Sequence, residues 1–264
     1  MPAPPVDLDA SRIALLAGAS LVAGAVNAVA GGGSLISFPA LLAVGYPALT
    51  ANVTNTVALC PGYVGGTLGY RRELEGQRRR GVVLGLLSVV GALLGSWLLV
   101  VSSPELFETI VPWLIFLACG LLAAQPRLAA ALRRRRGAGD GAPQGRMARW
   151  GPLIGAQFVA AVYGAYFGAG VGIMMLAILG IFVADSLQRL NALKGLLSLV
   201  INVIAAVFFA FLADVAWVAV GVMAVTALIG GQLGVLAARR LNDKVLRWIV
   251  VAFGVIVGLR LLVG

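Results

Sequence analysis

Long apolar runs recur from one end of this chain to the other. They cover residues 13–49, 51–70, 81–101, 109–125, 151–184, 190–212, 216–237 and 247–263. An α-helix needs about 20 mainly apolar residues to cross the hydrocarbon core of a bilayer, where every backbone polar group must be satisfied internally. Only 11% of the residues are charged, whereas a soluble domain carries about 25%. The pattern therefore predicts an all-α, polytopic membrane protein.

Two of the runs, 13–49 and 151–184, are too long for one ordinary helix, and glycines interrupt both. Three shorter runs follow each of them. Shifting the second half back by 137 to 139 positions aligns Gly31 and Gly33 with Gly168 and Gly170, and Asn52 and Asn55 with Asn191 and Lys194. Weak internal repeats of this kind occur in secondary transporters. We predict two inverted membrane repeats, 1–126 and 150–264, each a Gly-broken helical hairpin plus three transmembrane helices. A flexible basic cytoplasmic linker, 127–149, joins them.

The basic residues indicate the orientation, because Lys and Arg accumulate in cytoplasmic loops. If each Gly-broken run is a hairpin that enters and leaves on one side, every Lys and Arg except Arg12 and Arg260 falls on one face. If each run is instead a single crossing, the basic residues divide more evenly. The rule favours hairpins, with both termini outside and loops 71–80, 127–149 and 239–247 in the cytoplasm.

The start of the chain resembles a signal peptide, because the first apolar run contains Ala28-Val29-Ala30, which looks like a cleavage site. However, Asp7 and Asp9 oppose a lone Arg12, so the positive region of a signal peptide is missing. We therefore expect a retained membrane segment.

Most enzyme chemistry is excluded by what the chain lacks. It has no histidine, no Gly-x-Ser-x-Gly and no Walker A sequence, which removes histidine-based triads and imidazole metal sites. The two cysteines, Cys60 and Cys119, show no metal-ligand spacing. The basic residues lie in short loops rather than in a nucleic-acid-binding fold. We predict no enzyme activity, no cofactor, no metal and no nucleic-acid partner, and a small anion and the lipid bilayer as partners.

Polar residues inside the apolar runs form the candidate site, because polar groups at membrane depth are costly unless they serve a function. A glycine break exposes backbone N–H groups, and the N-terminus of a half-helix favours an anion. Lys194 adds a full positive charge, although its length also allows it to reach the cytoplasmic surface. Pairs of glycines four residues apart are explained by close helix packing. The candidate substrate-binding residues are Asn27, Gly31, Gly32, Gly33, Ser34, Asn52, Asn55, Thr56, Tyr166, Gly168, Gly170, Asn191, Lys194 and Ser198.

Coupling to protons or sodium is not expected, because no Asp or Glu lies in the middle of a run. An inside-negative potential supplies roughly 2.3 kcal/mol per charge per 100 mV to an anion that leaves the cell.

Two sets of polar and glycine-rich segments follow a known pattern. In the first half they are residues 25–39, with Asn27 and Gly31 to Ser34, and residues 51–56 with 69–71. In the second half they are residues 166–172 and residues 190–202. These segments resemble the TauE/SafE family of sulfite exporters. The resemblance covers nearly the whole chain and implies a bacterial inner-membrane permease of about eight spans. It implies small sulfur-containing anions as substrates, such as sulfite, sulfonates or sulfoacetate, often exported. Gly195 departs from the family pattern, in which asparagine is expected after Lys194, and this widens the site or removes a donor.

The leading prediction is therefore transmembrane transport of a small sulfur-containing anion, by alternating access or potential-driven uniport. The alternative is a membrane scaffold or assembly factor without transport activity, which predicts that the polar cluster is sealed. A homo-oligomer is left open, as are the exact substrate and the direction of transport.

Overall fold

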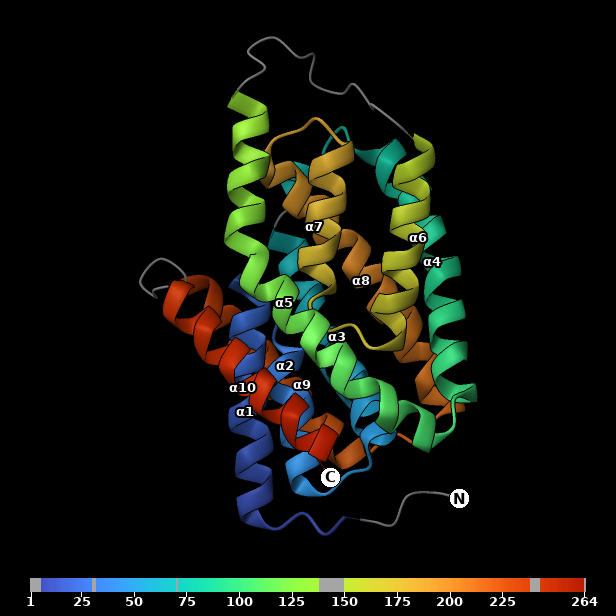
Figure 1. The fold of residues 1–264 in the computed structure, drawn as a ribbon, viewed down its shortest axis with the longest axis vertical. Coiled ribbons are helices and arrows are strands. Elements are labelled where there is room, and N and C mark those ends of the chain that lie inside the picture. Colours follow the sequence, from blue (N-terminus) through green and yellow to red (C-terminus); the bar gives the residue numbers. More distant parts are fainter. Residues whose placement is uncertain (1–5, 30–31, 70, 138–149, 238–242, 264) are drawn as a thin grey trace.

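The computed structural model describes residues 6–29, 32–69, 71–137, 150–237 and 243–263, and within these ranges the chain is helical, without a β-strand (Figure 1). The helices of the first half are α1 (Ala10–Val29), α2 (Ser34–Val44), α3 (Ala48–Gly69), the short 3-10 helix η1 (Arg71–Leu74), α4 (Arg78–Val101) and α5 (Pro104–Gly137). Those of the second half are α6 (Trp150–Tyr166), α7 (Val171–Phe182), α8 (Leu187–Leu212), α9 (Trp217–Ala237) and α10 (Asp243–Val263). Within the described residues, four helices are long and apolar enough to cross a membrane: α1, α4, α5 and α8.

Each long apolar run folds as a long helix followed by a short one. The short helices α2 and α7 have 11 and 12 residues. At a rise of about 1.5 Å per residue they reach only about 16–18 Å, roughly half of the hydrocarbon core. In Figure 1, α2 returns toward the end of the molecule where α1 begins, and α7 returns toward the end where α6 begins. The helix breaks that the glycines predict are therefore present, with Gly172 inside α7 rather than in the break.

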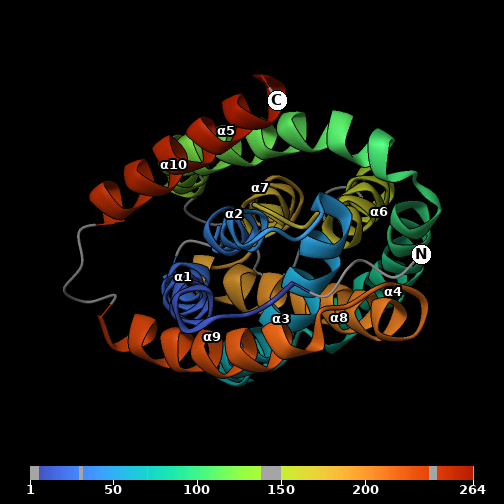
Figure 2. The ribbon, with the colours of Figure 1, turned by 90° about the horizontal axis from the view of Figure 1, so that it is seen from below.

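The two halves interlock. Helix α1 packs on α9, and α6 packs on α4. Helix α3 packs along both α8 and α9, and α5 packs on α10. Seen along the perpendicular direction, α5 and α10 lie on one side and α3, α8 and α9 on the other, with α2 and α7 between them (Figure 2). The short helices thus lie in the middle of the helix assembly, where both breaks are surrounded by protein.

Glycines lie at close helix crossings, as the small-residue pairs predict. A Cβ added at Gly230 of α9 would overlap the backbone oxygen of Leu21 in α1. A Cβ added at Gly95 of α4 would overlap the backbone oxygen of Val162 in α6. Backbones this close gain dispersion contacts that a larger residue would prevent. The same explanation holds for Gly91, which faces Ala161, and for Gly254 and Gly258, which face Cys119 and Phe116 of α5.

Two expectations differ from the structure. Helix α5 continues to Gly137, so the predicted flexible linker 127–149 begins as helix, and its residues 138–149 lie outside the described residues. Arg189, which falls between the predicted runs 151–184 and 190–212 and was therefore expected in a loop, lies in the first turn of α8 and forms an ion pair with Asp185 at 2.9 Å. The reason is local: Ser186 caps α8 by accepting a hydrogen bond from the Arg189 amide, and so starts the helix before that residue.

Candidate functional site

The first helix break is closed by Asn27, near the end of α1. Its side-chain Oδ1 accepts a hydrogen bond from the Gly33 amide at 2.8 Å. A Cβ at Gly33 would overlap the backbone oxygen of Ala23, so only glycine fits this approach of the chain to α1. The Gly33 amide, one of the predicted anion donors, is therefore already bonded within the protein. Gly31 lies outside the described residues.

A buried pair of side chains joins the start of α2 to α3. The Ser37 hydroxyl donates to Asn55 Oδ1 at 2.6 Å, and Ser37 also contacts the Gly33 carbonyl at 3.3 Å. Ser34, the first residue of α2, is half-buried. The Asn55 side chain is thus bonded to a residue that lies one turn after the break, and its oxygen already accepts a hydrogen bond within the protein.

The second break depends on two glycines in the left-handed region. Gly168 has φ +78° and Gly170 has φ +73°, a conformation that costs a residue with a side chain roughly 1–2 kcal/mol. The Gly168 amide donates to the Tyr163 carbonyl at 3.1 Å, which closes the end of α6. The Gly168 carbonyl then accepts from the Val171 amide at 3.2 Å. The chain reverses between these residues, and Gly170 caps the start of α7.

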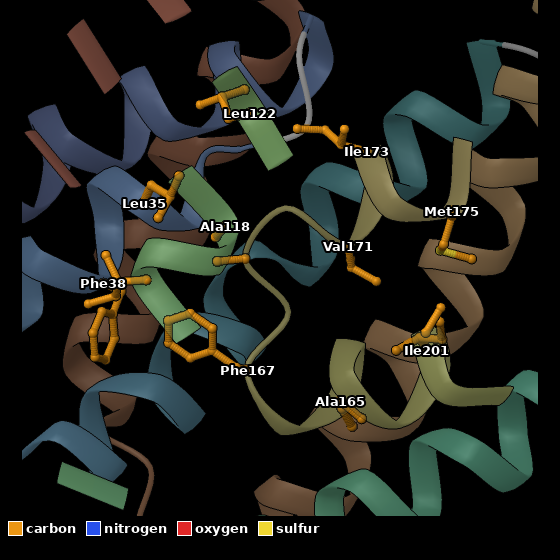
Figure 3. Close-up of a cluster of buried hydrophobic side chains, with 14 of the residues drawn as sticks. Leu35, Phe38, Ala118, Leu122, Ala165, Phe167, Val171, Ile173, Met175 and Ile201 are labelled. Atoms are coloured by element: carbon orange, nitrogen blue, oxygen red, sulfur yellow. The ribbon is translucent and has the colours of Figure 1, made fainter. Parts of the chain in front are cut away.

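Both breaks meet the same part of α5. A Cβ at Gly32 would lie 3.3 Å from the side chain of Leu122, and a Cβ at Gly170 would lie 3.4 Å from the backbone of Ala118. Phe38 of α2 packs edge-on against Phe167 of the second break, with ring centroids 5.6 Å apart. Figure 3 shows Phe38 and Phe167 facing each other beside the α5 segment that carries Ala118. The two breaks are therefore neighbours, packed against successive turns of one helix.

Asn52 connects the first half to the second break. Its Nδ2 donates to the Tyr166 carbonyl at 2.8 Å, while its Oδ1 is buried without a partner within the described structure. Thr56 donates back to the Asn52 carbonyl at 3.1 Å. The Tyr166 hydroxyl lies 3.3 Å from the Ser102 hydroxyl at the end of α4. Tyr166 is thus held by residues of the first half through both its backbone and its side chain.

Lys194 of α8 lies beside the start of α7. A Cβ at Gly172 would be 3.9 Å from the Lys194 Nζ and 3.7 Å from its Cδ. Ser198, one turn further along α8, contacts the Met175 sulfur at 3.4 Å. Asn191 lies about one turn before Lys194, near the start of α8, and is half-buried, as is Lys194. Gly195 faces Thr67 of α3, at 3.8 Å from an added Cβ, which is where an asparagine side chain would otherwise project.

The predicted residues therefore form two groups rather than one shell. The first contains the predicted residues Asn27, Gly33 and Asn55 together with Ser37, and the second contains the predicted residues Lys194 and Ser198 together with Gly172. Tyr63 of α3, which sequence reasoning missed, lies between them, because its hydroxyl is near the side chains of Asn27 and Asn202. Asn202 in turn donates to the Ser198 carbonyl at 2.9 Å. The position of Tyr63, three turns after Asn52 on the same helix, is the signal that could have revealed it.

A buried pair between α4 and α6 was also missed. Gln157 donates to the Ser88 hydroxyl at 3.0 Å, and both side chains are fully buried. In the described part of the chain, no group of three or more Cys, Asp or Glu side chains is placed to hold a metal ion.

Together these features define a polytopic, all-helical membrane protein whose two broken helices meet at its centre. The chain belongs to the TauE/SafE family: residues 16–261 match the family described as "Sulfite exporter TauE/SafE", which confirms the resemblance seen in the sequence.

Curated relatives of this chain are named as probable membrane transporters. The chain is 26% identical over 262 residues to the "Probable membrane transporter protein ORF9" of Sinorhizobium sp, which covers 97% of this chain and 94% of that protein. It is 24% identical over 244 residues to the "Probable membrane transporter protein YfcA" of Escherichia coli strain K12, covering 92% and 87%. A "Probable membrane transporter protein" of Haemophilus influenzae is 27% identical over 233 residues, covering 87% and 86%. No solved structure matches the chain. The relatives' names state membrane transport and name no substrate.

Proposed function

We propose that this protein exports a small sulfur-containing anion, such as sulfite, a sulfonate or sulfoacetate, across a bacterial inner membrane. The family description and the transporter names of the bacterial relatives support the class. The observation that supports an anionic substrate is the position of Lys194, whose ammonium group lies beside Gly172 at the start of the half-length helix α7. A cation at the N-terminal end of a helix creates a position where an anion is stabilised by both the side chain and the backbone.

The helix boundaries support an inverted repeat as the framework of this site. Helices α2 and α7 begin at residues 34 and 171, a shift of 137 positions. The next three pairs are each shifted by 139 positions. Helix α3 begins at 48 and α8 at 187, α4 begins at 78 and α9 at 217, and α5 begins at 104 and α10 at 243. The packing partners exchange under the same shift, because α1 on α9 becomes α6 on α4, and α3 on α9 becomes α8 on α4. In inverted repeats the substrate site lies where broken helices of the two halves meet.

The proposed binding residues follow from this framework. Lys194 supplies the charge, Asn191 and Ser198 lie on the same side of α8, and the first turn of α7 supplies backbone donors. Asn52 and Asn55 form the equivalent half-site on α3. Because the Gly33 and Gly168 amides are bonded internally, Gly32 and Gly170 are the break glycines whose amides we assign to the anion.

The proposed orientation places the start of α4 in the cytoplasm and the start of α5 outside. Glu75 and Glu105 are both exposed and mark these two ends. With Cys60 and Cys119 replaced by alanine, a membrane-impermeant maleimide added to whole cells should label Glu105→Cys and leave Glu75→Cys unlabelled until the cells are opened. Labelling of position 75 from outside would refute the orientation.

Transport is tested by flux into liposomes, over a panel of sulfite, methanesulfonate, thiosulfate and sulfate. Lys194→Gln should raise the KM for the transported anion by roughly tenfold or more, because a hydrogen bond to a charged group contributes about 1.5–3 kcal/mol. Lys194→Arg keeps the charge and should recover part of the loss.

Arg260→Gln is the matched control, since Arg260 is an exposed cation in the last turn of α10. It removes the same charge without touching α7. Equal KM values for the Lys194 and Arg260 variants would mean that Lys194 does not contact the anion. Absence of flux for the whole panel would contradict the proposed function.

A further inference from the structure

A carboxylate held between two guanidinium groups lies at the end of the molecule where α4 and α8 begin. Asp185 Oδ2 is 2.7 Å from Arg80 Nη1, and Asp185 Oδ1 is 2.9 Å from Arg189 Nε. The Asp185 side chain is 7% exposed, against 14% for Arg80 and 32% for Arg189. Two cations facing one anion leave a surplus of one positive charge in this trio.

The backbone completes an anion-binding geometry around Asp185. Its Oδ1 also accepts a hydrogen bond from the Ser186 amide at 2.9 Å. Ser186 is the cap of α8, a 26-residue helix, so the carboxylate lies at the positive end of a long helix dipole. Guanidinium groups and helix-terminal amides are donors that proteins use for sulfonate, sulfate and phosphate oxygens. The donors around the Asp185 carboxylate are therefore of the kinds that also bind an oxyanion.

The trio also ties the two halves together. Arg80 belongs to α4, while Asp185 lies in the connection between α7 and α8. Around it, Gln77 donates to the Arg189 carbonyl at 2.9 Å, and Arg189 Nη1 donates to the Glu75 carbonyl at 2.9 Å. The arginines Arg71, Arg72, Arg78 and Arg79, which are exposed beside it, outnumber Glu73 and Glu75. An anion that approaches this end meets a positive field before it meets the trio.

The same helix leads from the trio to the proposed binding residue. Arg189 and Lys194 are five residues apart on α8, which is a rise of about 7.5 Å. Asn191 lies between them. Polar and cationic side chains thus follow α8 inward from Arg189 to Lys194, Ser198 and Asn202.

We propose that Arg80 and Arg189 form the cytoplasmic access site for the transported oxyanion, and that Asp185 occupies this site as an internal competitor when no substrate is present. This inference rests on the proposed function. An arriving oxyanion takes over the two guanidinium groups and releases the Asp185 carboxylate. Release breaks the Arg80–Asp185 bond between α4 and the α7–α8 connection, so that the cytoplasmic end opens in response to substrate.

The test is uptake of ³⁵S-labelled sulfite into inside-out membrane vesicles, which present the cytoplasmic face to the label. Asp185→Asn removes the competing charge and should lower the KM by about three- to tenfold, whereas Arg80→Gln removes a donor and should raise it by a similar factor. The KM for Arg80→Gln measured in right-side-out vesicles should stay at the wild-type value. Arg12→Gln, an exposed cation predicted on the opposite face, should change neither KM.

Each result decides the matter. Opposite shifts of KM in the Asp185 and Arg80 variants support a competitor, because a purely structural ion pair would lower the amount of active protein in both without moving KM. Unchanged KM values, or shifts in the same direction, overturn the inference while the wild-type flux leaves the proposed function standing. If Asp185→Asn does not fold, the comparison of the KM of Arg80→Gln between inside-out and right-side-out vesicles decides between the two explanations. Absence of wild-type flux would instead remove the proposed function.

Discussion

Replacing Gly230 with leucine is expected to abolish the folded protein. Gly230 is buried at the crossing of α9 with α1, and even a Cβ there would overlap the backbone oxygen of Leu21. Overpacking usually costs about 1–3 kcal/mol when neighbouring side chains can move aside. Here the obstacle is backbone, so α1 and α9 must separate along their contact and lose packing that side-chain adjustment cannot restore. Detergent-solubilised Gly230→Leu should run as aggregate rather than as a single peak in size-exclusion chromatography.

Gly221→Leu is the matched control for this experiment. Gly221 lies in the same helix, is exposed, and has no atom within 4 Å of an added Cβ. It receives the same residue with the same change in helix propensity, so it should give the wild-type peak. A wild-type peak for Gly230→Leu would mean that α1 and α9 do not cross as closely as described here. Gly95→Leu, at the α4–α6 crossing, is expected to behave like Gly230→Leu.

Replacing Gly170 with leucine is expected to abolish transport while the protein still inserts and folds. Gly170 has φ +73° and its Cβ position lies 3.4 Å from the backbone of Ala118. The left-handed region costs a leucine roughly 1–2 kcal/mol, so the leucine either changes the backbone conformation at this position or pushes α7 away from α5. Either change moves the start of α7, and with it Gly172 and its contact with Lys194. The measurement is anion flux per folded molecule, with the folded fraction taken from size-exclusion chromatography.

Gly45→Leu separates backbone strain from loss of the site. Gly45 ends α2 with φ +109° and has open space around its Cβ position. It therefore suffers comparable conformational strain far from α7, and we expect it to retain most of the flux. If Gly45→Leu and Gly170→Leu lose flux equally, strain alone accounts for the result and the second break has no special part in transport.

Much of the helix framework could be predicted because the bilayer restricts the choices. The predicted run 81–101 corresponds to α4 at residues 78–101, and the run 190–212 to α8 at residues 187–212. Apolar length and glycine interruption are local properties, so they located the long helices and both breaks. The end of α5 was missed because the sequence of its last turns, with Arg133 to Arg136, is polar, so apolar length did not predict helix there.

The candidate site could be predicted only in part, because its contacts join residues that are distant in sequence. Asn52 bonds to Tyr166, and Arg80 bonds to Asp185, each across more than 100 positions. Nothing near Gly33 in the sequence indicates that its amide is taken by Asn27, since this depends on how α1 and α2 pack. Polarity inside the apolar runs therefore supplied the candidate residues, while their partners and their division into two groups required the structure.

The close crossing of α1 with α9 has a consequence for how the protein is made. Gly24 of α1 faces the backbone of Ala227 in α9, and these residues are separated by most of the chain. At about 5–20 residues per second, the ribosome needs roughly 10–40 s to synthesise the partner after the first helix has been made. During that interval the small-residue face of α1 lies against lipid or the insertion machinery. The contact between α1 and α9 can therefore form only after α9 has been made, so folding includes a late docking step that joins these two helices.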